Sequence, residues 1–339
     1  MMRLASPVGH AGLAAALLAA ASAPFWADAY HLSLASKMAV LGLYALGLQL
    51  LVGGAGMVSL GQAGFFAIGA YTLHLAQAPG APASILLTLP LAAAAAAAAA
   101  AAIGALALRT RSFFFLMVTL AFGQMIFFLF HDTPLGGSKD GVFVERPLLE
   151  AFGFAIEVPR RERAKVLLWL NLGMLAACYV GLLLLMRTLF GRALQGIRAN
   201  EPRMRALGYD TGALKLAAFV LAGGISGIAG HMWAMTYGFV SPELAGWHFS
   251  AEALLIVLLG GIGALHGPIL GAVAYVGLQE VASLLTERQN VVIGAAILAI
   301  VLLLPRGIAG LAPAPRPARP AAAEGAGAPL PARAAETRP

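Results

Sequence analysis

Apolar residues fill this chain in long blocks that carry few or no charges, and this pattern limits the possible folds more than any other feature. Of the 339 residues, 60% are apolar and 11% are charged, whereas about 25% of a soluble domain is charged. The blocks also lack the alternation of apolar and polar faces that soluble helices and strands show. The sequence therefore predicts an all-α integral membrane protein and excludes an ordinary soluble enzyme.

The apolar blocks are long enough to be membrane spans, because hydrocarbon about 30 Å thick requires roughly 20 apolar residues in a helix. This criterion predicts about ten transmembrane helices, near residues 10–27, 34–52, 63–78, 83–108, 113–131, 165–186, 216–237, 250–265, 267–285 and 290–304. The first block, with the triplet Ala21-Ser22-Ala23, also resembles a secretory signal and its cleavage site. We favour a retained helix, and the later spans keep their orientation in either case.

Basic residues set the expected orientation, because Lys and Arg concentrate in cytoplasmic loops. In segment 187–215, close to two span ends, six basic residues accompany two acidic ones. We therefore place this segment and both chain termini in the cytoplasm and the loop 132–165 outside, which puts 14 Lys and Arg residues inside and eight outside. No basic run is interleaved with aromatic residues, so the net charge of +7 does not indicate nucleic-acid binding.

Composition divides the chain into two parts. Residues 1–309 form the expected transmembrane domain, whereas residues 310–339 hold seven prolines among Ala, Gly and Arg. Such a tail buries too little apolar area to offset chain entropy, so we expect a disordered cytoplasmic extension. Within the domain, the uninterrupted alanines Ala92–Ala102 predict a helix of little bulk that approaches its neighbours closely.

The segment 187–215 carries helix-capping signals in addition to its charge. Asn200 suits an N-cap, Pro202 falls in the first turn of a helix, and Gly208 suits a left-handed residue after its end. These signals predict a short helix from about residue 201 to 207, with Asp210 or Thr211 capping the next span. The result is a rigid two-helix elbow that can transmit force. The alternative is a solvated basic loop that only fixes orientation.

Two glycine-rich stretches, Gly53–Gly64 and Gly260–Gly271, interrupt apolar blocks in the two halves of the chain. Non-helical backbone at membrane depth occurs only where it is buried in protein or lines an aqueous cavity. Paired interruptions of this kind are typical of an inverted repeat with a pathway between its halves. The alternative is that these glycines only allow close contacts between helices. The residues we predict to line the pathway are Ser59, Gly61, Gln62, Gln124, Glu252, Gly261 and Gly263.

Other chemistry has little support in the sequence. A Gly-x-Ser-Gly motif around Ser226 and a later His266 form a pattern that an intramembrane serine hydrolase uses, but Gly223 and Gly227 equally form a small-xxx-small packing face. The histidines lack the paired spacing of a metal site. None of the four lysines follows the glycine-rich loop of an ATP-binding P-loop.

Five blocks of residues, in this order, resemble the permease subunits of branched-chain amino acid ABC transporters, most closely the LivM type. They are Ser59–Tyr71, Phe114–Gln124, Gly191–Gly208, Gly238–Glu243 and Leu259–Pro268. The resemblance extends over roughly residues 34–305. Two departures are Lys139 in the external glycine motif and Pro202 in the elbow.

The resemblance implies a non-catalytic subunit, without a cofactor of its own, in a bacterial inner membrane. Its partners would be membrane lipid, a homologous second permease, a periplasmic substrate-binding protein, and two ATPase subunits that bind ATP and Mg²⁺. The residues implied in ATPase coupling are Arg192, Arg198, Asn200, Glu201, Pro202, Arg203, Arg205 and Gly208. Branched-chain amino acids, other amino acids, urea and short amides all remain possible substrates. An ATP-independent secondary carrier is the main alternative, although it would have no use for the elbow.

Overall fold

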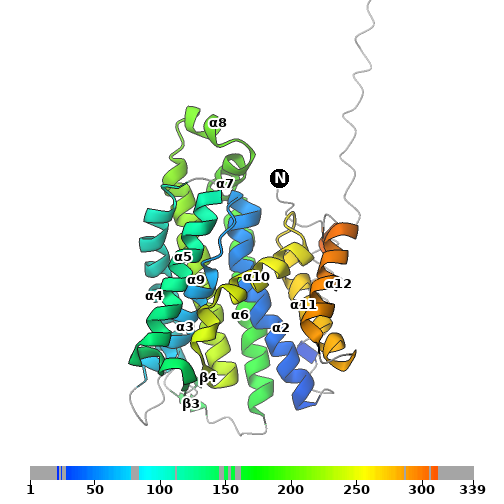
Figure 1. Cartoon of the computed structure of the whole chain (residues 1–339). Helices are drawn as coiled ribbons and strands as arrows, with labels where there is room; N and C mark the ends of the chain where they lie inside the picture. Colours follow the sequence, from blue (N-terminus) through cyan, green and yellow to red (C-terminus); the bar gives the residue numbers. More distant parts are fainter. Residues whose placement is uncertain are drawn as a thin grey trace, which may run out of the picture.

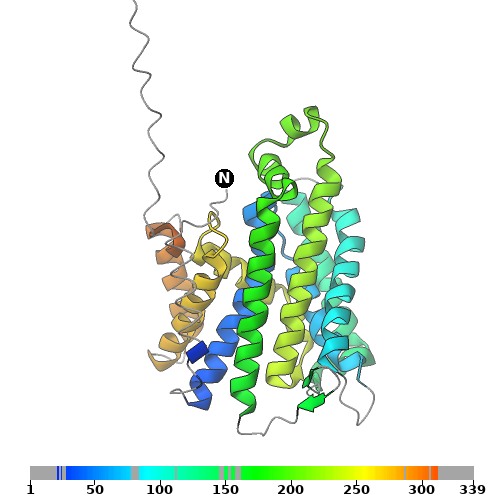
Figure 2. The same ribbon diagram turned by 180° about the vertical axis from the view of Figure 1, so that it is seen from behind.

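We describe a computed structural model of the chain (Figures 1 and 2). It describes residues 21–22, 24, 28–77, 84–110, 113–144, 149–151, 154–156, 162–285, 288–304 and 307–311. The expected first span, 10–27, lies almost entirely outside these residues, and so does most of the expected tail, 310–339.

Helices dominate the described residues and confirm an all-α membrane fold. The apolar helices are α2 (Ala29–Gln49), α3 (Gln62–Leu75), α4 (Ile85–Ala107), α5 (Phe113–Asp132), α6 (Arg163–Arg187), α9 (Thr211–Tyr237), α10 (Trp247–Gly260), α11 (Gly267–Leu285) and α12 (Gln289–Leu303). The nine expected spans that fall on described residues all coincide with one of these helices.

Six helical segments among the described residues are long and apolar enough to cross a membrane. These six are α2 with its π-helical continuation Leu50–Ala55, together with α4, α5, α6, α9 and α11. The helices α3 and α10 have 14 residues each and α12 has 15, fewer than the roughly 20 that a full span needs. Judged by helix length, therefore, the described residues contain six full spans, and the predicted count of about ten is not confirmed.

Small residues bring α3, α4 and α9 unusually close. A Cβ added at Gly69 on α3 would lie 2.0 Å from the carbonyl oxygen of Gly227 on α9, and one added at Gly227 would lie 2.4 Å from the Cβ of Ala96 on α4. Backbones in lipid approach in this way only through Gly and Ala. The predicted close packing of the alanine-rich helix is confirmed, and Gly227 belongs to a packing face.

Two short helices project from one end of the bundle, which we call the elbow end (Figure 1). They are α7 (Leu189–Ala199) and α8 (Glu201–Ala206). The opposite end, the strand end, carries an antiparallel pair formed by β1 (Val142–Phe143) and β4 (Phe239–Val240), and a second pair formed by β2 (Leu149–Ala151) and β3 (Phe154–Ile156). Segment 187–210 and the described residues of segment 132–156 thus lie at opposite ends of the bundle, in agreement with the expectation that they face opposite sides of the membrane.

Candidate functional site

Local capping shapes the elbow as the sequence predicts. The Asn200 side chain accepts a hydrogen bond of 3.0 Å from the backbone N–H of Arg203, which caps α8. Pro202 lies in its first turn, and Gly208 follows its end with φ +85° in the left-handed region. Asp210 caps α9 by accepting from a backbone N–H three residues further on. The predicted two-helix elbow is confirmed.

Glu201 ties the elbow to the membrane helix that follows it. Its carboxylate accepts hydrogen bonds from Arg205 at 2.6 Å, from Lys215 on α9 at 2.5 Å and from Thr211 at 3.2 Å. Partial burial raises the pKa of Glu201, but the hydrogen bonds and charges of Lys215 and Arg205 outweigh that effect, so the pKa lies below its ordinary value. Glu201 therefore braces α8 against α9 from inside the elbow.

Arg198 ties the elbow to the end of α2. Its guanidinium Nη1 donates a 2.5 Å hydrogen bond to the carbonyl oxygen of Gly53, in the π-helical turn. Gly56 follows that turn with φ +73°, and a Cβ there would lie 3.0 Å from the Cγ of Arg198. Arg198 therefore connects the elbow directly to the end of α2, where that helix is interrupted.

The outer surface of the elbow presents both charge and apolar area. Arg192 and Arg203 are exposed, and so are Leu207 and Tyr209, with 66% and 47% of their surface accessible. The sequence analysis missed Leu207 and Tyr209 because exposure cannot be read from residue type.

The first interruption, Gly56–Gly61, is non-helical and is held in place by α5. The backbone N–H of Leu60 donates to the Thr119 hydroxyl at 3.2 Å, and the N–H of Gly61 donates to the Ser59 hydroxyl at 3.3 Å. A Cβ at Gly61 would lie 2.6 Å from the Thr119 carbonyl oxygen. The hydroxyls thus replace the helical hydrogen bonds that this backbone lacks.

The two predicted interruptions meet through Gln49 of α2, which the sequence analysis did not single out. This side chain is fully buried, and its Nε2 donates to the carbonyl oxygens of Ile262 at 2.9 Å and Ala264 at 3.0 Å. Both carbonyls belong to the turn between α10 and α11, where Gly261 has φ +107°. An amide in an otherwise apolar span was the available signal for this contact.

The two short helices beside these interruptions also meet: α3 follows the first interruption, and α10 precedes the second. The backbone N–H of Ala63, in the first turn of α3, donates to the hydroxyl of Ser250, in the first turn of α10, at 2.9 Å. The two 14-residue helices therefore begin side by side inside the bundle.

A cavity of about 780 Å³ opens at the elbow end, and we call it the elbow-end cavity. Basic side chains dominate its polar lining: Arg109, Arg198, Arg205 and Lys215 accompany Glu201. Residues 55–58, where the first membrane helix is interrupted, form part of its wall. The cavity therefore lies where the elbow and the interrupted helix meet.

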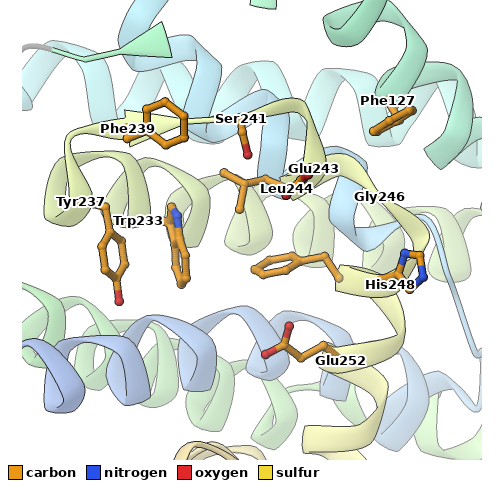
Figure 3. Close-up of a pocket in the computed structure, with 11 residues that line it drawn as sticks. Phe127, Trp233, Tyr237, Phe239, Ser241, Glu243, Leu244, Gly246, His248 and Glu252 are labelled. Atoms are coloured by element: carbon orange, nitrogen blue, oxygen red, sulfur yellow. The ribbon is translucent and has the colours of Figure 1, made fainter. Parts of the chain in front are cut away.

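A second cavity, of about 810 Å³, lies towards the strand end, and we call it the strand-end cavity (Figure 3). Its walls come from the last turns of α9, the connection from α9 to α10, the first turns of α10, and Phe127 of α5. The aromatic rings of Trp233, Tyr237 and Phe249 line the same cavity as the Glu252 carboxylate. Both volumes fall within the range of about 300–1,000 Å³ that is typical of small-molecule sites.

The chain matches, over residues 30–302, the family model described as the permease component of branched-chain amino acid transport systems. The chain belongs to this permease family. It is 31% identical to the high-affinity branched-chain amino acid transport permease LivM of Salmonella typhimurium, with 87% of this chain and 74% of that relative covered. These matches confirm the resemblance found in the sequence.

Partial matches extend to two further permeases. LivH of Escherichia coli is 29% identical over 35% of this chain and 39% of its own length. The autoinducer 2 import permease LsrC of Escherichia coli O9:H4 is 37% identical over 26% of this chain and 28% of its own length. No solved structure matches the chain.

In this permease the predicted pathway residues fall into separate groups. Ser59, Gly61 and Gln62 are buried at the start of α3 and line neither cavity, whereas Glu252 lines the strand-end cavity. Gln124 on α5 is half-buried and its Nε2 has no hydrogen-bond partner within the described part of the chain.

The serine of the Gly-x-Ser-Gly motif has a structural partner in the permease. The Ser226 hydroxyl donates to Oε1 of Gln62 at 2.9 Å, and both residues are fully buried between α3 and α9. This hydrogen bond joins two closely packed helices, so nothing in the geometry supports an activated nucleophile. Among the described residues, no group of three His, Cys, Asp or Glu side chains is arranged to hold a metal ion.

Proposed function

We propose that this chain is a transmembrane permease subunit of an ATP-binding cassette importer for branched-chain amino acids or related small solutes. It forms half of the translocation pathway and is not itself an enzyme; ATP and Mg²⁺ bind to separate ATPase subunits. The observation that carries the proposal is the Arg198–Gly53 hydrogen bond, which connects an exposed, capped elbow to an interruption in a buried membrane helix.

The elbow supplies the ATPase contact in this proposal. Its exposed surface combines Arg192 and Arg203 with the apolar side chains of Leu207 and Tyr209, a combination suited to a groove on another protein. Asn200, Pro202 and Gly208 hold that surface in shape, whereas Glu201 and Arg205 brace it from within. Most of the residues that the family resemblance implies in ATPase coupling therefore position the contact surface, and only a few of them form it.

Closure of the ATPase subunits on ATP would move the elbow as a rigid body. Arg198 would pass the movement to Gly53 and so to the non-helical segment 56–61. Two packings of the interrupted segments would then alternate, and ATP binding would favour one of them by binding it more tightly. Hydrolysis would restore the other packing.

We infer a pathway built from an inverted repeat of about ten spans. In its favour, α3 and α10 are equally short, and the Ala63–Ser250 hydrogen bond joins their first turns. Such half-helices near the middle of a bundle are typical of transporters with repeated halves. The two cavities lie at opposite ends of this junction.

The proposed assembly contains a second, homologous permease, two ATPase subunits and a periplasmic binding protein in a bacterial inner membrane, with the elbow and both termini in the cytoplasm. Its support is that the chain matches both LivM and LivH, two proteins named as permeases of a branched-chain amino acid transport system. The basic residues of segment 187–215 favour this orientation.

Copurification from the native membrane in mild detergent tests the proposal. We expect mass spectrometry to identify an ATPase with a P-loop and a second permease. Arg203→Glu combined with Leu207→Asp should remove the ATPase and retain the second permease. The matched control is Lys139→Ala, an exposed charge at the strand end. Retention of the ATPase by the double variant would contradict the elbow contact, and ATP-independent uptake by the chain alone would favour the secondary carrier.

A further inference from the structure

The strand-end cavity has an unusual charge for a membrane protein. Glu243 and Glu252 both contribute to its lining, and no Lys or Arg is among the described residues that line it. His248, at its rim, is exposed. A carboxylate that faces a cavity within an apolar bundle creates a strong negative potential, because the surroundings screen it poorly.

The walls beside Glu252 are aromatic and rigid. The ring centroids of Trp233 and Tyr237 are 4.4 Å apart, and those of Trp233 and Phe249 are 5.9 Å apart. Phe249 in turn stacks on the fully buried Tyr44 at 5.2 Å. Aromatic faces attract cations through their quadrupole when the charge lies within about 6 Å. The cavity therefore combines the two features that recognise an ammonium group.

The Glu252 carboxylate is not neutralised by a direct ion pair. Tyr275 of α11 and Lys37 of α2 are the groups near it. Lys37 donates its own 2.9 Å hydrogen bond to Gln279, and none of the salt bridges within 4.0 Å in the described part of the chain includes Glu252. In Figure 3 the carboxylate points toward the side of the cavity where Trp233 and Tyr237 lie.

We propose that the strand-end cavity is a binding site for the ammonium group of the transported solute. Glu252 takes the charge, Trp233 and Phe249 present their ring faces to it, and the remaining apolar wall receives the rest of the solute. The site selects amino acids and amines and excludes urea, short amides and hydroxy acids, which have no ammonium group. This inference rests on the proposed transport function for its solute, but the cation preference of the cavity is independent of any ATPase.

Charged thiol reagents measure that preference directly. Ser241 lines the cavity, and Ser241→Cys in a Cys178→Ala background of the full-length chain, in native membranes, places one reactive thiol there. We expect a cationic methanethiosulfonate to react at least about fivefold faster than an anionic one after correction for their reactivity with a free thiol. Thr110→Cys, in the wall of the basic elbow-end cavity, is the matched control and should show the opposite preference.

Glu252→Gln identifies the group responsible, because it removes the charge and keeps the shape of the side chain. In this variant we expect the cation preference at the Ser241→Cys thiol to fall at least about threefold. Glu252→Asp should retain it. Glu280→Gln is the control, since Glu280 binds Tyr30 with a 2.5 Å hydrogen bond and is not among the residues that line the cavity.

Protection by small probes then tests recognition. We expect 3-methylbutylamine to slow modification of the Ser241→Cys thiol in a saturable manner, and 3-methylbutan-1-ol to have no effect at equal concentration. The Glu252→Gln variant should lose the protection. Equal reaction rates for the two reagents, or equal protection by the amine and the alcohol, would overturn the inference. A cation preference that persists without ATP-coupled uptake would contradict the proposed function alone.

Discussion

The two cavities of this permease are nearly equal in volume and opposite in charge. The strand-end cavity, of about 810 Å³, is lined by two carboxylates and several aromatic rings. The elbow-end cavity, of about 780 Å³, is lined by four basic side chains and one carboxylate. Two cavities of similar volume in one helix bundle can thus present opposite chemistry, because different helices and connections supply the side chains that line them.

A rigid frame keeps the two ends distinct. The helices α3, α4 and α9 pack through Gly and Ala at backbone distances that permit no larger side chain. Adaptable backbone is instead concentrated at the non-helical segments 56–61 and 261–266. A solute with one positive and one negative group would therefore meet a favourable wall for each charge at opposite ends of a fixed scaffold.

Gly69→Val should have the largest effect, because it destroys the frame that both cavities share. Its Cβ would lie 2.0 Å from the Gly227 carbonyl oxygen, and overpacking of this kind costs about 3 kcal/mol or more of folding stability. We expect little folded protein in gel filtration. Gly173→Val is the control, since nothing lies within 4 Å of the corresponding Cβ. Normal yield of the Gly69 variant would contradict the packing described here.

Gln49→Leu should have the second-largest effect on stability, and it tests the contact between the two interruptions. Removing the amide leaves the carbonyls of Ile262 and Ala264 without these buried donors, at a cost of about 2 kcal/mol. We expect a lower thermal midpoint of the purified permease. Gln195→Leu, at a half-buried position of α7, should change it little. An equal loss in both variants would show that Gln49 has no special role.

The elbow was predictable from sequence because the forces that shape it are local. Asn200, Pro202 and Gly208 act on backbone groups within a few residues, and the structure has the cap, the first-turn proline and the left-handed glycine that they predict. The membrane spans were predictable for the same reason, since hydrophobicity is a property of a single segment.

Other features depended on partners that are distant in sequence. Gln49 and Ile262 are 213 residues apart, and Ala63 and Ser250 are 187 apart, so no local pattern joins them. The strand-end cavity likewise takes Phe127 from α5 and Glu252 from α10. The number of full-length spans was also not predictable from the length of the apolar blocks. The blocks near residues 63–78 and 250–265 extend past the ends of α3 and α10, which have only 14 residues each.

Arg198→Met should affect one end of the molecule and not the other. It keeps most of the side-chain volume and removes the hydrogen bond to Gly53. We expect ATP-dependent uptake in proteoliposomes of the full complex to fall about tenfold, because a charge-assisted hydrogen bond contributes roughly 1.5–3 kcal/mol, while ATP hydrolysis continues. Lys139→Met, which removes an exposed charge at the strand end, is the control and should leave uptake nearly normal. In Arg198→Met the cation preference of the strand-end cavity should be unchanged, which would show that the two ends of the molecule act separately.

Mild acid should produce the smallest effect, confined to the elbow. Because the pKa of Glu201 is lowered in the folded protein, its ionised form stabilises the elbow above the ordinary pKa of about 4.5, and that contribution disappears as pH falls through the lowered value. The side chain is 28% exposed, so the gain is modest. A spin label at Ala206→Cys, in a Cys178→Ala background, should gain mobility as the pH falls below about 4.5. In Glu201→Gln the label should be mobile already at pH 6 and respond little to acid; a full pH response in that variant would assign the transition to another group.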